Sequence, residues 1–148
     1  MKNPNKYIRK AIIDRLTGNV IVNGVTLDVI GQGTFETSFP FIRVYSYTAQ
    51  EVDFNQTSFI QEVRTNIEVV YRYPTDSGGE TEADDAVNQI FELIRIRTEG
   101  YFDLSAEGFN VFTCIVDNID NYNDIENDFT YIRKIILISN KVQQINGI

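Results

Sequence analysis

The stretch FIQEVRTNIEVVYRY, residues 59–73, decides the fold of this chain. From residue 62 onward its apolar and aromatic residues occupy every second position, with only Thr65 and Val70 out of phase: Val63, Ile67, Val69, Tyr71 and Tyr73. Strict alternation of this kind predicts a half-buried antiparallel strand. Fifteen residues at about 3.3 Å each would extend roughly 50 Å, which is more than twice the common strand length. Such a strand must bend around a partner or project as an arm.

The residues before this stretch predict its partner strand. Phe39–Tyr47, with the sequence FPFIRVYSY, has the aromatic and β-branched composition of a strand. A polar interruption, Ala49–Ser58, separates it from the long strand. The two strands and this loop predict a long β-hairpin at the centre of the fold.

Two helices flank the predicted hairpin. The first runs from about Pro4 to Leu16, with Asn3 placed to cap it and Gly18 just past its end. The second runs from about Thr81 to Arg97 and begins with acidic residues, which the helix dipole favours. Each helix has an apolar stripe at helical spacing, so each must pack on the sheet.

A short hairpin and a glycine-containing connection lie between the first helix and the first long strand. Residues Val20–Leu27 are two short apolar runs around Asn23-Gly24, a pair that tolerates the positive φ angles of a type I′ turn. The connection Gly31-Gln32-Gly33-Thr34 lacks the third glycine, the following helix and the nearby lysine of a phosphate loop, so a plain turn is predicted.

The last third of the chain predicts two more strands. Phe109–Ile119 and Phe129–Ser139 are joined by the polar stretch 120–128, and both are apolar on both faces. A strand of this kind needs cover on both faces. The helices can cover one face, which leaves the other for a folded-over hairpin or a neighbouring subunit. The tail, residues 143–148, is expected to be flexible.

Together these elements predict an α+β fold, a mostly antiparallel sheet with a long β-hairpin packed by two helices, in the order α-β-β-β-β-α-β-β. With 148 residues the chain is expected to form a single domain, residues 1–148, without metals or disulfides. The N-terminus lacks the apolar core of a signal peptide, so the expected place of synthesis is the cytoplasm. The net charge of −8 argues against binding the outside of nucleic acid.

Catalytic chemistry has few candidates in this sequence. Histidine is absent, which removes the commonest general base and metal ligand. Cys114 lies mid-strand and is expected to be a small buried apolar residue. The acidic stretch around residues 117–128 does not follow the ligand spacing of a calcium loop and is expected to be a solvated hairpin loop. We therefore expect no enzyme activity, no catalytic residues, no metal and no cofactor.

The tyrosines of the long hairpin, Tyr45, Tyr47, Tyr71 and Tyr73, allow two interpretations. Tyrosine is enriched at protein interfaces, so they could form a contact surface. They could equally form a cross-strand aromatic ladder that stabilises the sheet. Both roles are compatible with one another.

The order of elements, with a strand opening Pro40-Phe41-Ile42-Arg43-Val44 and a helix with an alanine-containing start and an Ile-Phe-Glu-Leu-Ile segment, resembles the tail terminator (tail completion) and neck protein families of tailed bacteriophages. The resemblance covers about residues 7–142 and depends on topology and a loose Pro-Phe-Ile pattern. It implies a homo-oligomeric ring, hexamer or dodecamer, at the head-tail junction of the virion. Its partners would be portal, adaptor or tail-tube proteins, and DNA would pass through without specific binding. No membrane is involved.

The resemblance leads to a hypothesis about surfaces. Subunit contacts are expected from two strand faces: Phe41, Arg43, Tyr45, Tyr47, Val63, Ile67, Val69 and Tyr71. Contacts with an adjoining ring or with the channel are expected from two loops: Glu51, Asp53, Phe54, Asp120, Tyr122 and Asp124. On this hypothesis, aspartate at positions 45 and 69 together abolishes assembly and leaves the monomer folded.

Two other functions are compatible with the sequence. A small ligand-binding or accessory α+β domain that acts as a dimer would have a cleft between the helix at 81–97 and the sheet. A hydrolase that uses the acidic loop with a divalent ion would be stabilised by that ion.

Overall fold

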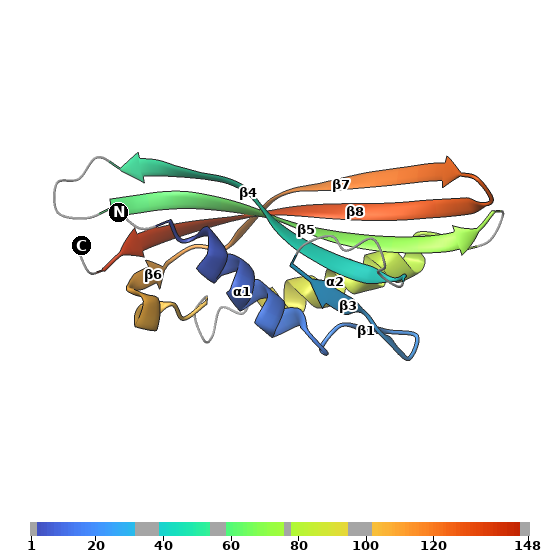
Figure 1. The fold of residues 1–148 in the computed structure, drawn as a ribbon, viewed down its shortest axis with the longest axis horizontal. Coiled ribbons are helices and arrows are strands. Elements are labelled where there is room, and N and C mark those ends of the chain that lie inside the picture. The colour runs from blue at the N-terminus through green and yellow to red at the C-terminus, as the bar shows by residue number, and fades with distance from the viewer. Residues whose placement is uncertain (1–2, 32–38, 54–58, 76–77, 95–101, 146–148) are drawn as a thin grey trace.

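The computed structural model describes residues 3–31, 39–53, 59–75, 78–94 and 102–145. It has the α+β fold with a mainly antiparallel sheet that the sequence predicts. Four long strands form the sheet: β4 (Phe41–Asp53), β5 (Phe59–Pro74), β7 (Ile115–Glu126) and β8 (Phe129–Gln144). They lie side by side as one elongated, twisted layer, with both helices beneath it (Figure 1).

The short elements complete the layer. A small hairpin, β1 (Ile21–Val22) and β2 (Val25–Thr26), forms its own two-stranded sheet. The strands β3 (Asp28–Ile30) and β6 (Phe109–Val111) join the main sheet beside β4 and β8, and β6 follows a 3₁₀ turn, η1 (Ser105–Glu107). Among the strands of the described residues, only β3 pairs in parallel, with the start of β4.

The order of the long strands is β4-β5-β8-β7, and every pair in it is antiparallel. β5 and β8 pair along sixteen residues each, from Phe59 opposite Gln144 to Pro74 opposite Phe129. β8 is shared on its other side, since β7 pairs with its first two thirds and β6 with its last residues. β4 and β7 are therefore the outer long strands.

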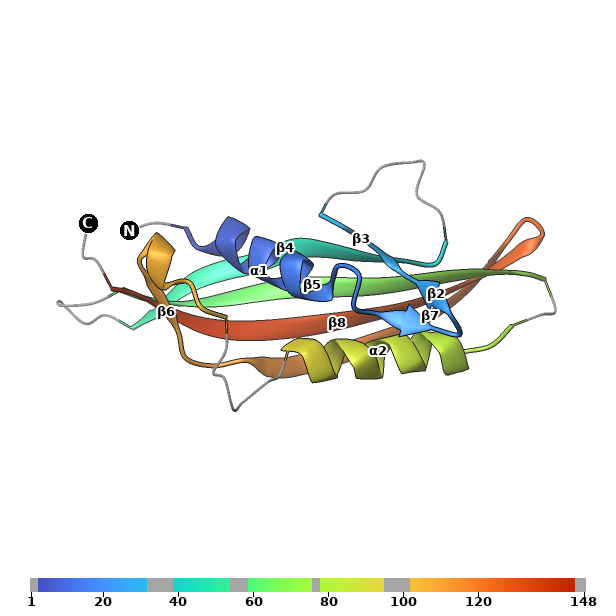
Figure 2. The ribbon, with the colours of Figure 1, turned by 90° about the horizontal axis from the view of Figure 1, so that it is seen from below.

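Helix α1 (Asn5–Leu16) covers the β4 side of the sheet, and helix α2 (Thr81–Ile94) covers the β8 side (Figure 2). α1 begins one residue later than predicted, with Pro4 at its N-cap position, and Asn3 Oδ1 accepts a hydrogen bond from the Asn5 amide at 3.0 Å. The predicted turn of the small hairpin is confirmed: Asn23 and Gly24 have φ angles of 51° and 78°. The predicted residues Arg95–Arg97 of the second helix lie outside the described residues.

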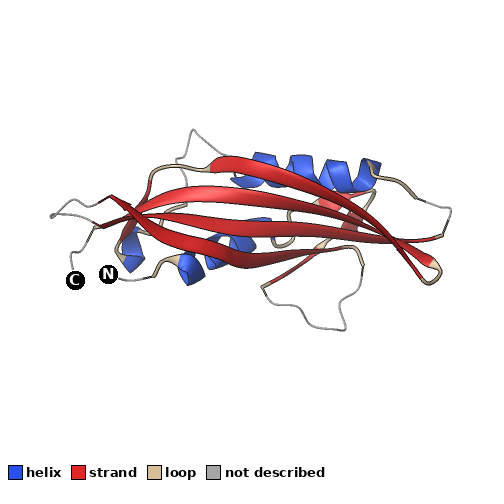
Figure 3. Cartoon of the chain, turned by 90° about the horizontal axis from the view of Figure 1, so that it is seen from above, coloured by secondary structure: helices blue, strands red, loops and turns tan. Residues whose placement is uncertain are grey.

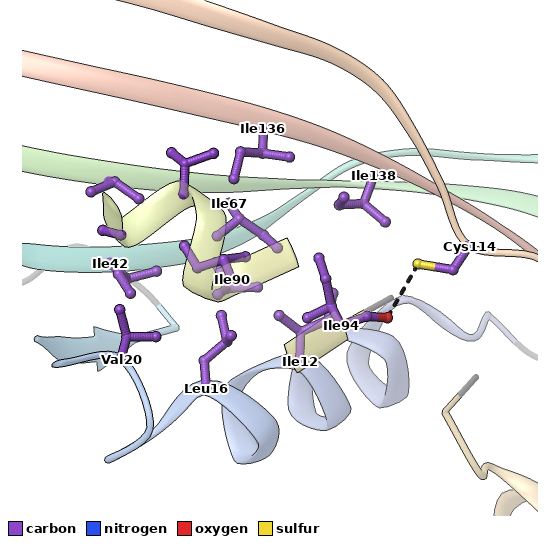
Figure 4. Packing of buried hydrophobic residues seen from close by; sticks show 14 of the residues in the cluster. Ile12, Leu16, Val20, Ile42, Ile67, Ile90, Ile94, Cys114, Ile136 and Ile138 are labelled. Carbon is purple, nitrogen blue, oxygen red and sulfur yellow. Dashed lines mark hydrogen bonds between the residues drawn. The ribbon is translucent and has the colours of Figure 1, made fainter. Parts of the chain in front are cut away.

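The core lies between the two helices and one face of the sheet (Figure 4). Ile8, Ile12 and Leu16 of α1 are fully buried there, and α2 contributes Ile90 and Ile94. Cys114 is buried as expected, and its thiol donates a hydrogen bond to the Ile94 carbonyl oxygen at 3.6 Å. The helices and the sheet thus share one continuous apolar layer.

Four predicted boundaries are wrong. Residues 49–53 continue β4, and residues 120–126 continue β7, which turns into β8 through Asn127-Asp128 with a positive φ at Asn127. The predicted strand 109–119 is broken at 112–114, where the chain passes from β6 to β7. Gln143 and Gln144 lie in β8, paired with β5 and β6, so the predicted flexible tail begins too early. In the three cases where a strand is longer than predicted, backbone pairing to β5 or β8 extends it through residues that have no apolar alternation of their own.

Candidate functional site

The sheet has one face covered by helices and one face with none in front of it, here called the open face (Figure 3). The strand register assigns Phe41, Arg43 and Tyr45 of β4 to the open face, because Ile42 and Val44 between them are fully buried on the helix side. These three side chains are half-buried, and Tyr47, next to a register shift, is 59% exposed. The β4 half of the predicted contact set is therefore accessible.

The burial of the β5 residues corrects the β5 half of the predicted contact set. Val63, Ile67 and Val69 are fully buried under the helices, and Tyr71 is 4% exposed. Their alternation reflects packing in the core of the monomer, so these side chains are not free to contact another subunit. Aspartate at Val69 would therefore place a charge in the core, so we expect such a variant to unfold, contrary to the expectation from the sequence.

The residues predicted as loops are mostly strand residues. Glu51 and Asp53 belong to β4, and Phe54 lies outside the described residues. Asp120, Tyr122 and Asp124 belong to β7, where all three are exposed and paired through the backbone to β8. They are close enough to one another along one strand to act as one surface, but they do not form a loop.

An ion pair occupies the centre of the open face. Arg43 Nη2 donates to Glu68 Oε1 on the neighbouring strand, and the Glu68 side chain is 4% exposed. The Arg43 guanidinium also lies 5.0 Å from the centre of the Tyr45 ring. Burial, and then the Glu68 carboxylate, raises the pKa of the Tyr45 hydroxyl above its usual value. This face is therefore built from paired charges and aromatic rings and is not a plain solvated surface.

An aromatic cluster that sequence reasoning missed lies on the open face toward the β7–β8 turn. The guanidinium of Arg72 lies 4.6 Å from the ring centres of both Phe39 and Phe129. The Phe39 ring also contacts the rings of Phe41, at 5.2 Å, and Tyr131, at 5.8 Å. Stacking of this kind stabilises an arginine on an exposed surface. The sequence contained a signal for this cluster. Phe129 and Tyr131 occupy alternate positions of one predicted strand and Arg72 lies in another, but the pairing of these two strands was not predicted in detail.

The two outer long strands each have an unpaired side among the described residues. β3 pairs with Phe41–Arg43 only, so no described strand pairs with Val44–Asp53 on that side; we call this segment the β4 edge. β7 pairs only with β8, so its whole length, Ile115–Glu126, is the β7 edge. Unpaired N–H and C=O groups along an edge are a template for pairing with another strand. Edges of this length are the most distinctive surface of the described chain.

The β7 edge combines exposed apolar residues with acidic ones. Ile115, Ile119, Tyr122 and Ile125 are 50%, 38%, 48% and 74% exposed. Its charged residues are all acidic: Asp117, Asp120, Asp124 and Glu126. Only Asp117 has an ion pair, with Arg64 Nε at 3.5 Å, among the ion pairs of the described residues.

Alternative sites gain no support from the described residues. No group of three or more Asp, Glu or Cys side chains there is close enough to hold a metal ion. The contact between α2 and the sheet is filled by core residues such as Ala83, Ala86 and Ile90, where a ligand cleft was the alternative expectation. An open hollow of about 190 Å³ lies instead beside α1, lined by Tyr7, Lys10, Asp14 and Asp103 among others. Most of the Gly31–Thr34 connection lies outside the described residues.

None of the described helices is long and apolar enough to cross a membrane. A scan against protein-family models found no match to this chain. A search of curated proteins likewise found no matching relative.

Proposed function

We propose that this chain is a structural subunit of a tailed bacteriophage particle, where copies of it form a ring at the head-tail junction around the DNA channel. The observation that carries the proposal is the pair of long unpaired edges on opposite sides of one sheet. A subunit with two different contact edges joins copies head to tail, and such contacts close into rings when the rotation between copies allows it.

The open face supports the same role. A sheet with one face packed on helices and the other bare exposes a large surface with aromatic rings and paired charges. Large exposed surfaces with apolar content mark sites of protein contact. In a ring, this face and the ends of the long strands are available to the channel and to the adjoining portal, adaptor or tail-tube ring.

The test is to separate a lysate of the producing culture on a density gradient and to probe each fraction for the chain. We expect it to travel with intact particles at a fixed low copy number. A chain that stays wholly in the unsedimented fraction, while particles assemble without it, would refute the proposal.

A further inference from the structure

We propose that copies of this chain join through the β4 edge of one copy and the β7 edge of the next, so that their sheets form one continuous antiparallel sheet. This inference describes how subunits join in the ring of the proposed function. It rests on the proposed function for the existence of that ring. The joint itself is argued from strand direction and from the charge of the two edges.

The direction of the strands fits such a joint. β4 is antiparallel to β5, β5 to β8, and β8 to β7, so β4 and β7 run in opposite directions. Copies related by rotation about a ring axis keep the same orientation relative to that axis, so equivalent strands of neighbouring copies run in the same direction. The β7 edge of one copy therefore meets the β4 edge of the next in antiparallel fashion, and the alternation continues across the joint without interruption. Four long strands per copy, an even number, are what makes this possible.

The charge of the β7 side argues against pairing of two β7 edges in a twofold dimer. Over Ile115–Glu126 there are four acidic residues and no lysine or arginine. Helix α2 next to it, over Thr81–Ile94, also has four acidic residues and no basic residue. Like charges directly opposite one another destabilise a strand pair. The β7 edge needs a partner edge that is uncharged or basic.

The first part of the β4 edge meets this requirement. Residues Val44–Gln50 have no charged side chain, and the acidic residues Glu51 and Asp53 lie at the end of the edge. Helix α1 (Asn5–Leu16), which packs against β4, has four basic residues and one acidic residue, a net charge of +3. Arg9 of this helix reaches the strand itself, where its Nη1 donates a hydrogen bond to Ser46 Oγ at 2.6 Å. The side of the molecule that would receive the acidic β7 edge therefore carries the basic helix.

Geometry sets where the two edges overlap. β3 already occupies the side of Phe41–Arg43, and Glu51 and Asp53 would repel the acidic β7 edge, so an incoming β7 strand pairs with the residues between them, Val44–Gln50. Closing a sheet into a ring requires a stagger between strands in any case. In the joint the exposed Ile119 and Ile125 side chains of β7 would be covered by the neighbouring copy.

The test uses Tyr47, which is 59% exposed on β4, so that its substitution leaves the monomer's stability within about 0.5 kcal/mol. The matched variants are Tyr47→Asp and Tyr47→Lys, which both remove the ring and differ in charge. Self-association of each purified chain is measured by sedimentation velocity at low and high salt. We expect Tyr47→Asp to associate about tenfold more weakly than Tyr47→Lys at low salt, because the new carboxylate faces an acidic edge. High salt should narrow the difference.

A rescue and a direct readout complete the test. Adding Asp120→Lys to Tyr47→Asp should restore association. Hydrogen exchange should show amide protection rising on assembly in Val44–Gln50 and Ile115–Glu126. Equal behaviour of the two Tyr47 variants, unchanged protection of both segments, or a wild-type chain that remains monomeric or stops at a twofold dimer would overturn the inference.

These results separate the joint from the function. If the chain travels with particles but the two Tyr47 variants assemble alike, the joint is wrong and the proposed function stands. If the variants differ as expected but the chain never travels with particles, the joint stands and the proposed function is wrong.

Discussion

Gly78 lies against the ring of Tyr73 in a way that no other residue type can copy. Its φ angle is +77°, and a Cβ atom added there would lie 2.2 Å from Tyr73 Cγ. The Tyr73 ring is itself stacked on Tyr71, with ring centres 5.9 Å apart and an angle of 13° between the planes. Gly78→Ala must therefore adopt an unfavourable backbone conformation and also push the Tyr73 ring off this stack.

The expected loss of stability follows from these two effects. A left-handed backbone conformation costs a residue with a Cβ atom about 1–2 kcal/mol. Overpacking against a ring that is held on its other side adds about 1–3 kcal/mol. We therefore expect Gly78→Ala to lower the free energy of unfolding by about 2–5 kcal/mol. At about 2–4 °C per kcal/mol for a chain of this size, the melting temperature should fall by at least about 4 °C.

Two other glycines separate the two effects. Gly24 has a φ of +78° with nothing within 4 Å of an added Cβ, so Gly24→Ala should show the conformational cost alone. Gly79 has open space and no positive φ, so Gly79→Ala should change stability by less than about 0.5 kcal/mol. Urea unfolding followed by circular dichroism measures all three. If Gly78→Ala costs no more than Gly24→Ala, the contact with Tyr73 contributes nothing and the reasoning is refuted.

Three further predictions concern the core, the tyrosines and a buried lysine. Val69→Asp should abolish the cooperative unfolding transition seen by circular dichroism, since Val69 is fully buried, whereas Tyr45→Asp on the open face should keep it; two folded variants would contradict the core assignment. Burial and the nearby Glu82 carboxylate raise the pKa of Tyr73 to about 12, so its contribution to stability should be complete below about pH 10 and lost as the pH rises toward 12; urea unfolding across this range should show a smaller loss for Tyr73→Phe. Lys134, 3% exposed and 3.1 Å from Glu80 Oε2, should tolerate Lys134→Met within about 1 kcal/mol because Glu80 stays half-exposed, and carboxyl titration by NMR should show the lowered pKa of Glu80 returning toward its usual value.

The long strands and the turns with local signals could be predicted from the sequence. The alternation from Val63 to Tyr73 identified β5, and Asn23-Gly24 identified the small hairpin, because each pattern is set by residues close together in the chain. The same alternation shows that Val63, Ile67 and Val69 belong to the core. Assigning them to a subunit contact overlooked that the monomer's own helices need that face.

The extent of β7 could not be predicted in this way. Residues 120–126 have the composition of a solvated loop, and all their side chains are exposed. They form a strand because β8, which comes later in the chain, supplies the backbone partners. The same is true of Glu51 and Asp53 at the end of β4, which pair with the beginning of β5. Pairing of this kind is decided by the tertiary fold. The two edges that define the candidate assembly surface therefore could not be predicted from local sequence patterns.

The position of β8 in the chain has a consequence for the timing of folding. β8 is the strand to which both β5 and β7 pair, and it follows both of them in the chain. While the ribosome is still making the protein, β5 lacks its main partner and β7 has none. The sheet can therefore be completed only after β8 has been made. The β7 edge first exists once β8 is paired with β7, so chains that still lack β8 cannot join one another through this edge.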